Sequence, residues 1–394
     1  MTAQTISAVP SAAPRAKAKK QKVANPKKKI VLLPGDGIGP EVTRVAADVL
    51  RTCAAEGGHR LEFTELPFGG AGIDAEGEPL PAATLKACIA ADAILLGACG
   101  GPKWDARPPG QRPESGLLAL RKGLGLYINL RPVRLRPALA GISPLRPERA
   151  GVIDIEIVRE LAGGIYFGER GQETVRGVER AWDVETYSTP EIERVARYGF
   201  ARAEARTRRL TSVDKANVLT SSALWRRTVT RFAEKHPAVQ VDHMYVDNAA
   251  MQLVLAPARF DVILTSNMFG DILSDGAAAL VGSIGLIPSM STGSGPSLYE
   301  PIHGSAPTLA GKDVACPIGA ILSAAMLLRE SLGLTEEGAA VDKAVDRVLE
   351  RGFRTADIAE PTGQTVGCAR FGELVNEELR AALKQGARGK AGRV

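Results

Sequence analysis

KIVLLPGDGIGPE (residues 29–41) joins a short apolar run to a glycine-rich turn, and a helical pattern follows as far as Cys53. This order of strand, turn and helix is typical of an α/β unit. The glycines are spaced G-x-G-x-G and Pro40 comes next, whereas a Rossmann dinucleotide site requires G-x-G-x-x-G. The turn is therefore either a structural tight turn or a contact for a phosphate or nicotinamide group.

The same alternation of apolar runs and helical patterns continues along the 394 residues, of which 45% are hydrophobic and 24% charged. The composition and the alternation indicate an α/β enzyme, and the length suggests two or three structural units. Strands are predicted at residues 93–96, 151–158, 239–241 and 260–264, and helices at 189–209, 219–236, 319–329 and 336–351.

The net charge of +6 comes from the N-terminus, because the chain beyond residue 29 is close to neutral. Residues 1–29 contain no acid, and their low apolar content predicts a disordered arm. The arm is either a transit peptide, which would place the protein in the plastid stroma, or a solvated tail of a cytoplasmic protein. N-terminal sequencing of the native protein distinguishes these two. The basic residues of the arm are Arg15, Lys17, Lys19, Lys20, Lys22, Lys27, Lys28 and Lys29.

Two features argue against other classes of protein. The five cysteines include no C-x-x-C pair, so neither a disulfide framework nor a zinc site is indicated. No uninterrupted run of about 18 apolar residues occurs, and the N-terminus lacks the apolar segment of a secretory signal. Since the body is nearly neutral as well, we expect neither a membrane nor a nucleic acid as a partner.

Three arginines recur near the ends of apolar runs: Arg121, Arg131 and Arg159. Arginine forms paired hydrogen bonds with carboxylates, so a dicarboxylic substrate would explain this set if the three converge. A single arginine is more commonly a surface charge. The interpretation therefore depends on their meeting in the fold.

A tyrosine and a lysine stand in unusual surroundings. Tyr166 lies between glycines in GGIYFGE (residues 163–169), where a backbone can approach a ligand closely, although a packed core tyrosine would also fit. Lys215 interrupts the strand-like run SVDKANV (residues 212–218), and lysine is rarely buried without a partner. Both are therefore candidate functional residues.

Three carboxylates complete the set of candidates. Asp271 and Asp275 are four residues apart, so on a helix they would share one face and repel each other unless a cation lay between them. Together with Asp247 they would offer oxygen ligands, which suit Mg²⁺ or Mn²⁺. The alternative is an acidic bias at a helix N-terminus. Residues 300–307 (EPIHGSAP) form a loop that could cover a ligand.

Taken in order, these segments resemble the β-decarboxylating dehydrogenases, the family of isocitrate and isopropylmalate dehydrogenases. The similarity runs from about Ile30 to Glu378 and implies two α/β domains around a central cleft, without a Rossmann fold. The first domain would comprise residues 30–126 and 282–394 and the second residues 127–281. The motifs are LPGDGIGPEV, GGPKWD, GLLALRK, NLRP, RELAGGIYFGE, SVDKANVL, FGDILSD and EPIHGSAP.

The resemblance implies an oxidoreductase that uses NAD and a divalent metal to oxidise and decarboxylate a malate. The apolar side chains of Leu117, Leu118 and Leu120 resemble those of the family branch that acts on isopropylmalate in leucine biosynthesis. The active unit would be a homodimer with shared active sites, to which Lys215 and Asp247 reach across from the partner. The roles implied are substrate carboxylate binding by Arg121, Arg131 and Arg159, proton donation by Tyr166, base catalysis by Lys215, and Mg²⁺ or Mn²⁺ binding by Asp247, Asp271 and Asp275.

The resemblance places NAD along the first domain, but this chain departs from the family pattern there. Thr308 stands where an aspartate usually holds the adenosine ribose, and Cys316 replaces an asparagine; Ala162 replaces a threonine elsewhere. Rival interpretations are a dehydrogenase for isocitrate, tartrate or another alkylmalate, and a non-catalytic paralogue. The implied NAD contacts are Gly37, Ile38, Glu114, Asn217, His303, Gly304, Ser305, Ala306, Pro307, Thr308 and Cys316.

Overall fold

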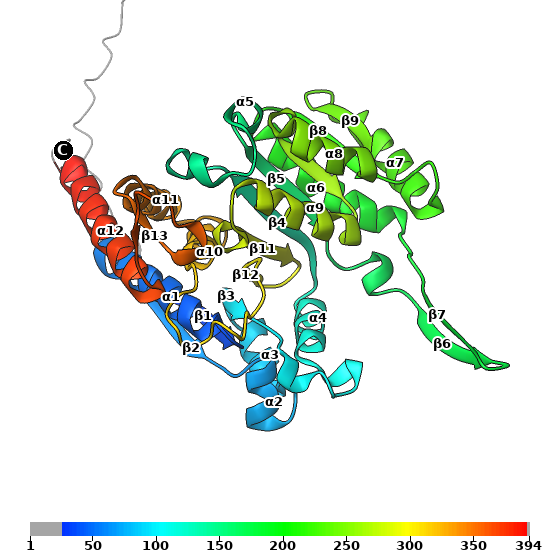
Figure 1. The fold of residues 1–394 in the computed structure, drawn as a ribbon, viewed down its shortest axis with the longest axis horizontal. Coiled ribbons are helices and arrows are strands. Elements are labelled where there is room, and N and C mark those ends of the chain that lie inside the picture. The colour runs from blue at the N-terminus through cyan, green and yellow to red at the C-terminus, as the bar shows by residue number, and fades with distance from the viewer. Residues whose placement is uncertain (1–25, 392–394) are drawn as a thin grey trace, which may run out of the picture.

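One ten-stranded sheet runs through the whole molecule (Figure 1). The computed structural model describes residues 26–391. The predicted α/β class is confirmed, because helices cover the sheet on both sides. In spatial order the strands are β2 (Leu61–Glu65), β1 (Lys28–Gly35), β3 (Ala93–Ala98), β12 (Ser297–Pro301), β11 (Pro288–Gly293), β4 (Leu126–Arg134), β5 (Asp154–Glu160), β10 (Val262–Thr265), β8 (Arg209–Asp214) and β9 (Gln240–Tyr245).

The sheet is parallel at its two ends and antiparallel in the middle. β1 pairs in parallel with β2 and β3, and β8 pairs in parallel with β9 and β10. Between them, β11 is antiparallel to both β12 and β4, and β4 is antiparallel to β5. The strands from the two predicted domains therefore fall in separate halves that meet where β11 pairs with β4. The exact domain limits stay a prediction.

Two groups of helices cover the two halves of the sheet. In the first half α1 packs against α10 and α12, and α10 against α11; in the second, α6 packs against β5, β8 and β10. Nearly all of α10 is buried, which explains why its sequence is apolar on every face. The helices are α1 (Gly39–Gly57), α6 (Thr189–Glu204), α7 (Thr220–Ala233), α8 (Val246–Leu255), α9 (Asn267–Leu280), α10 (Ile318–Glu330), α11 (Thr335–Glu350) and α12 (Cys368–Ala391).

Shorter elements complete the fold around the sheet. The short helices are α2 (Gly70–Glu76), α3 (Ala82–Ile89), α4 (Pro113–Gly123) and α5 (Pro147–Ala150), and β13 (Phe353–Arg354) pairs with β14 (Gln364–Thr365). Single turns of 3₁₀-helix occur at Pro102–Trp104, Pro109–Gln111, Pro137–Ile142, Gly164–Tyr166, Pro257–Arg259, Ile284–Leu286 and Ala356–Ile358. None of the helices within residues 26–391 combines the length and apolar character needed to cross a membrane.

A two-stranded hairpin projects far from the body of the second half (Figure 1). Its strands are β6 (Arg170–Val175) and β7 (Val178–Asp183), joined by a two-residue turn in which Arg176 and Gly177 both have positive φ. Such turns match the twist of a hairpin. Every residue of β7 is exposed, including the apolar Val178 and Trp182. An isolated two-stranded hairpin is marginally stable in water, so exposed apolar groups at this position are unusual.

Three local predictions need correction. β1 begins at Lys28, so the last residues of the predicted arm belong to the sheet; residues 1–25 lie outside the described part of the chain. The helix predicted to continue to residue 209 ends at Glu204, and Arg208 adopts positive φ before β8 begins. Lys215 does not lie within a strand, because β8 ends at Asp214.

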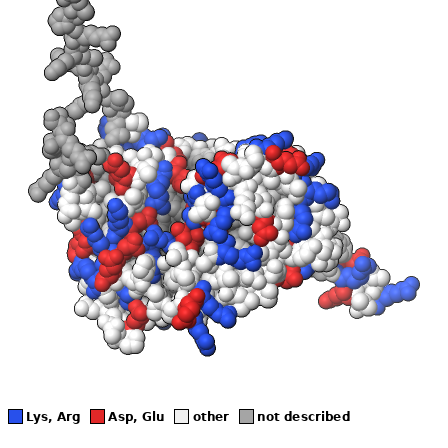
Figure 2. All heavy atoms as spheres, turned by 90° about the horizontal axis from the view of Figure 1, so that it is seen from above, with Lys and Arg blue, Asp and Glu red and all other residues white. Residues whose placement is uncertain are grey.

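The surface charge is mixed over the face shown in Figure 2, where basic and acidic side chains alternate. Ion pairs link many of them, for example Arg202 with both Glu156 and Glu330. This distribution agrees with the nearly neutral body that the sequence indicates.

Candidate functional site

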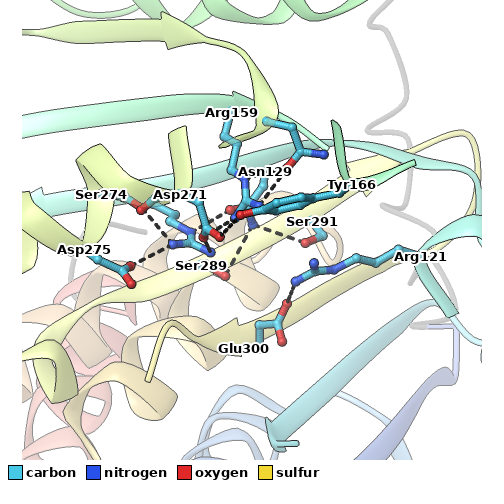
Figure 3. A network of polar contacts seen from close by, with 12 residues as sticks. Arg121, Asn129, Arg159, Tyr166, Asp271, Ser274, Asp275, Ser289, Ser291 and Glu300 are labelled. Carbon is cyan, nitrogen blue, oxygen red and sulfur yellow. Dashed lines mark hydrogen bonds and ion pairs between the residues drawn. The ribbon is translucent and has the colours of Figure 1, made fainter. Parts of the chain in front are cut away.

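The three arginines singled out in the sequence converge on one cavity, and Figure 3 labels two of them, Arg121 and Arg159. Arg121 comes from α4, Arg131 from β4 and Arg159 from β5, and all three line one cavity of about 250 Å³. Arg131 and Arg159 are buried, and Arg121 is only 11% exposed in its side chain. Their convergence supports the interpretation that they bind an anionic substrate.

Asp271 is the carboxylate at the centre of this cluster. Its Oδ1 accepts a hydrogen bond of 2.5 Å from Nη1 of Arg159 and lies 3.3 Å from Nη2 of Arg131, and its Oδ2 accepts a bond of 3.0 Å from the Tyr166 hydroxyl. Asp275 lies one turn further along α9, where its Oδ1 accepts a bond of 3.1 Å from Arg131. The prediction that the two aspartates share one helix face is confirmed.

Burial changes the protonation behaviour of this cluster. It lowers the pKa of the Arg131 and Arg159 guanidinium groups, and each arginine also feels the repulsion of its cationic neighbours. Burial raises the pKa of the Tyr166 phenol, and the Asp271 carboxylate raises it further. Tyr166 therefore holds its proton at neutral pH, as a proton donor must.

The cavity also has an apolar side. Leu117 and Leu118 on α4 line it together with Tyr166, and the backbone of residues 97–99 closes it behind them. The third leucine, Leu120, is fully buried in the smaller hydrophobic core and does not line the cavity. Leu120 is therefore wrong as a pocket residue, because its side chain is enclosed in the core and offers no surface to the cavity.

Lys215 and Asp247 form a separate pair outside this cluster. Their Nζ and Oδ1 atoms are 2.6 Å apart, and the Asp247 side chain is 65% exposed. The hydrogen bond from Lys215 lowers the pKa of Asp247. Among the described residues no hydrogen bond or ion pair connects this pair with Asp271, Asp275 or the arginines. One chain alone thus does not assemble the three predicted metal ligands.

Several large apolar side chains are exposed on α8, on α9 and in the segments that follow Lys215 or precede α8. Tyr245 precedes α8, Ile272 follows Asp271 on α9, and α8 packs against α9. Large exposed apolar patches commonly mark interfaces between proteins. We call this surface the α8/α9 face; its exposed apolar members are Val218, Tyr245, Met251, Val254, Leu255 and Ile272.

The glycine turn and the loop after β12 meet, although about 270 residues of chain separate them. The Ile38 backbone N–H donates to the Ser305 carbonyl at 2.8 Å, and a Cβ at Gly37 would overlap that same oxygen. Gly37 has a φ of 59°. The carboxylate of Asp36 holds the turn by accepting hydrogen bonds from the backbone of Gly70 and Gly100.

Some of the remaining predicted cofactor residues lie beside the cavity, and others are exposed at the surface. His303 is buried beside the cavity, with its Nε2 lacking a partner among the described residues, and Gly304 lines the cavity too. Ala306 has a positive φ of 38°, which keeps the loop tightly turned. Pro307 and Thr308 are exposed next to it, as are Glu114 and Asn217 on other elements.

Cys316 is the exception among the predicted cofactor contacts. Its side chain is buried in the main core next to Gly285, and burial raises the pKa of its thiol. A side chain enclosed in this way offers no surface for a ligand. The structure therefore does not support a side-chain contact between Cys316 and a cofactor.

Gly37→Ala is expected to disturb cofactor binding. An alanine with this positive φ costs about 1–2 kcal/mol of folding free energy, and its Cβ would push the 303–307 loop away. The matched control is Gly77→Ala, since Gly77 also has positive φ but has nothing within 4 Å of the added Cβ. Both variants should lose stability in thermal unfolding, whereas only Gly37→Ala should raise the KM for NAD, by roughly tenfold. Equal KM values in the two variants would contradict this role.

Several polar residues of the site were missed in the sequence. Asn267 accepts hydrogen bonds from Nε and Nη2 of Arg159, and Asn129 and Ser274 accept from Arg131. Glu300 binds Nη2 of Arg121 at 2.9 Å. Asn129, Ser274 and Glu300 each lie inside a quoted motif (NLRP, FGDILSD and EPIHGSAP), which was the available signal. Asn267 lies outside these motifs, and its role depends on a contact between distant segments.

A second group of potential metal ligands occurs at Glu41, Asp313 and Cys368. Its members already have structural tasks. The Asp313 carboxylate accepts a hydrogen bond from the Ala369 N–H at the start of α12, and its carbonyl accepts from Cys368. We therefore interpret this group as the N-terminal anchor of α12.

Comparisons with known proteins agree with this geometry. Residues 29–375 match the family model described as isocitrate/isopropylmalate dehydrogenase. A 3-isopropylmalate dehydrogenase from Oleidesulfovibrio alaskensis is 54% identical, covering 89% of this chain and 99% of the relative; one from Bacillus licheniformis is 56% identical, covering 91% and 96%. An isocitrate dehydrogenase structure from Methylococcus capsulatus superposes with a TM-score of 0.81 at 33% identity, covering 90% of this chain and 99% of that one.

Proposed function

Because the chain belongs to the isocitrate/isopropylmalate dehydrogenase family, we propose that it catalyses the NAD-dependent oxidative decarboxylation of (2R,3S)-3-isopropylmalate to 4-methyl-2-oxopentanoate and CO₂, a step of leucine biosynthesis. The observation that carries this proposal is the cavity that is lined by three arginines, by Tyr166 and by the partly buried side chains of Leu117 and Leu118. Relatives at 54–56% identity bear the name of this activity.

The substrate has two carboxylates and an isopropyl group, and the cavity offers a matching partner for each. Arg131 and Arg159, held in place by Asn129 and Asn267, would bind the malate carboxylates with little rotational freedom to lose. Arg121 supplies a third guanidinium. Leu117 and Leu118 provide apolar contact for the isopropyl group, where isocitrate would leave its third carboxylate unpaired.

Two proton transfers accompany the reaction. Lys215 would take the hydroxyl proton of the substrate. NAD, when bound, would supply the redox chemistry by accepting the hydride from C2. The C3–carboxylate bond then breaks, CO₂ leaves, and the electron pair stays on C3. Tyr166 donates its proton to C3, and the raised pKa of its phenol keeps that proton in place until then.

The carboxylates of Asp271 and Asp275 would hold Mg²⁺ or Mn²⁺ together with Asp247 of the partner subunit. Their fit is supported by the donor set, which contains only oxygen, and by their position on one helix face beside the arginines. When bound, the cation supplies positive charge that stabilises the developing negative charge on the substrate oxygen. Asp271 already orients Tyr166 through its Oδ2.

A homodimer would bring together the Lys215–Asp247 pair and the arginine cluster with Tyr166, which are separate in one chain. The α8/α9 face carries Asp247 and Asp271 among exposed apolar side chains, and the β6/β7 hairpin presents Val178 and Trp182 to solvent. A two-fold interface buries the same surface on both copies. If each of these surfaces pairs with the same surface of a second copy, both apolar surfaces are covered. The pairing would also bring Lys215 of one copy towards Tyr166 of the other.

Substrate preference tests this proposal directly. Turnover is measured with 3-isopropylmalate, isocitrate and tartrate, each with NAD or NADP and Mg²⁺. We expect the highest kcat/KM with 3-isopropylmalate and NAD, and a preference for isocitrate would overturn the assignment. A non-catalytic paralogue, which Thr308 and Cys316 make worth testing, would show no turnover with any pair and no heat of NAD binding in calorimetry.

A further inference from the structure

A second cavity, of about 380 Å³, adjoins the site but plays no part in the proposed reaction. It lies between the end of α4, the beginning of β4 and the segment after β5. Its volume falls within the range that small-molecule sites occupy. The side chains that matter are three cations, Arg121, Lys122 and Arg194, and three apolar or aromatic groups, Tyr127, Ala162 and Phe167.

The lining of this cavity carries positive charge without a carboxylate. The counterions of its arginines stand outside the lining: Glu300 lies 2.9 Å from Arg121, and the buried Glu160 lies 3.4 Å from Arg194. Lys122 is exposed and forms no ion pair with any described residue. An anion would therefore meet three cations and no competing acid in the wall.

Two of these cations each have one N–H group without a hydrogen-bond partner among the described residues. The Nε atoms of Arg121 and Arg194 are both buried and have no hydrogen-bond partner among the described residues. A buried donor without a partner costs about 1–3 kcal/mol, and a side-chain rotation that turned Nε towards the cavity would let a ligand's acceptor recover that energy. Arg194 is held in position because its guanidinium lies 4.5 Å from the centre of the Tyr127 ring.

The rest of the cavity wall is largely apolar. Tyr127 and Phe167 provide aromatic surface, and Ala162 adds only a methyl group. A ligand that fits here has a carboxylate at one end and a compact apolar group at the other.

We propose that this cavity binds a small monocarboxylate with a branched or aromatic apolar group, and that the bound anion inhibits the enzyme. Inhibition follows because Arg121 lines both cavities. An acceptor that engages Arg121 from this side competes with the malate carboxylate for the same guanidinium. The ligand therefore raises the KM for the malate substrate.

The test uses 3-methylbutanoate as the probe on the full-length protein. Calorimetry measures its binding, with 3-methylbutan-1-ol as the control for the apolar group and acetate as the control for the charge. Kinetics then measures its inhibition constant. The variants are Ala162→Thr, which adds a hydroxyl and a methyl group to the cavity wall, and Lys122→Gln, which removes one cation. Neither residue belongs to the proposed catalytic set.

We expect millimolar or tighter binding of 3-methylbutanoate and much weaker binding of both controls. Lys122→Gln should weaken binding about fivefold, the equivalent of about 1 kcal/mol, and Ala162→Thr should abolish it. In the absence of the probe both variants should keep kcat and KM within about twofold of the unsubstituted enzyme. Binding is measured without turnover, so this result is independent of the proposed reaction.

Two outcomes would overturn the proposal. The first is the absence of a binding heat for 3-methylbutanoate with the unsubstituted protein. The second is equal inhibition of both variants and the unsubstituted enzyme, which would place the probe in the catalytic cavity alone.

Discussion

Replacing Lys215 by methionine is expected to lower kcat by roughly 10²–10⁴-fold, the range that a general base contributes. Methionine keeps the length of the side chain but cannot accept the hydroxyl proton of the substrate. Since the Lys215 side chain is 27% exposed and its partner Asp247 65%, solvent weakens this ion pair, and the substitution should leave the melting temperature nearly unchanged. Steady-state kinetics and thermal unfolding measure the two effects separately.

The matched control is Lys235→Met, because Lys235 is an exposed lysine beyond the end of α7 in the same half of the molecule. It should retain full activity. Calorimetry with NAD and 3-isopropylmalate should show that Lys215→Met still binds both. A kcat within threefold of the unsubstituted enzyme would exclude Lys215 as the base, whatever the substrate.

In the proposed mechanism, the separation of base and acid would make the site depend on assembly. Tyr166 lies in the arginine cluster of its own chain through Asp271, while Lys215 and Asp247 pair with each other on the α8/α9 face. A single chain would then have a binding cavity with the proposed proton donor, while the proposed base lies outside it. The hairpin and the α8/α9 face supply the apolar surface that a second copy would cover.

Local sequence patterns were sufficient for the elements that carry the site. The apolar run at residues 30–33 is a buried strand, and the four-residue spacing of Asp271 and Asp275 places both on one face of α9. These predictions held because periodicity reports which side of an element is buried. The helix that stops at Glu204 shows the limit, since residues 205–208 have helical composition but turn towards β8.

What could not be predicted depends on contacts between distant segments. Asn267 is one example: its side-chain oxygen accepts a hydrogen bond from Arg159, 108 residues earlier in the chain, and no local sequence pattern indicates this contact. The β6/β7 hairpin is another, because its charged and apolar residues read as an ordinary loop until the Arg176–Gly177 turn is seen. Lys215 was expected inside a strand because its apolar neighbours continue the pattern past Asp214.

The central claim is that each active site is built from two chains, and mixed dimers test it most directly. Tyr166→Phe and Lys215→Met protomers, each carrying a different affinity tag, are unfolded together, refolded and separated, and the purified heterodimer is assayed. If each active site is shared between chains, one of the two sites of the heterodimer contains both substitutions. The other site then contains neither and is intact. The expected result is about half the activity of the unsubstituted dimer, although each parent homodimer is nearly inactive. A heterodimer as inactive as its parents would show that Lys215 and Tyr166 act within the same chain.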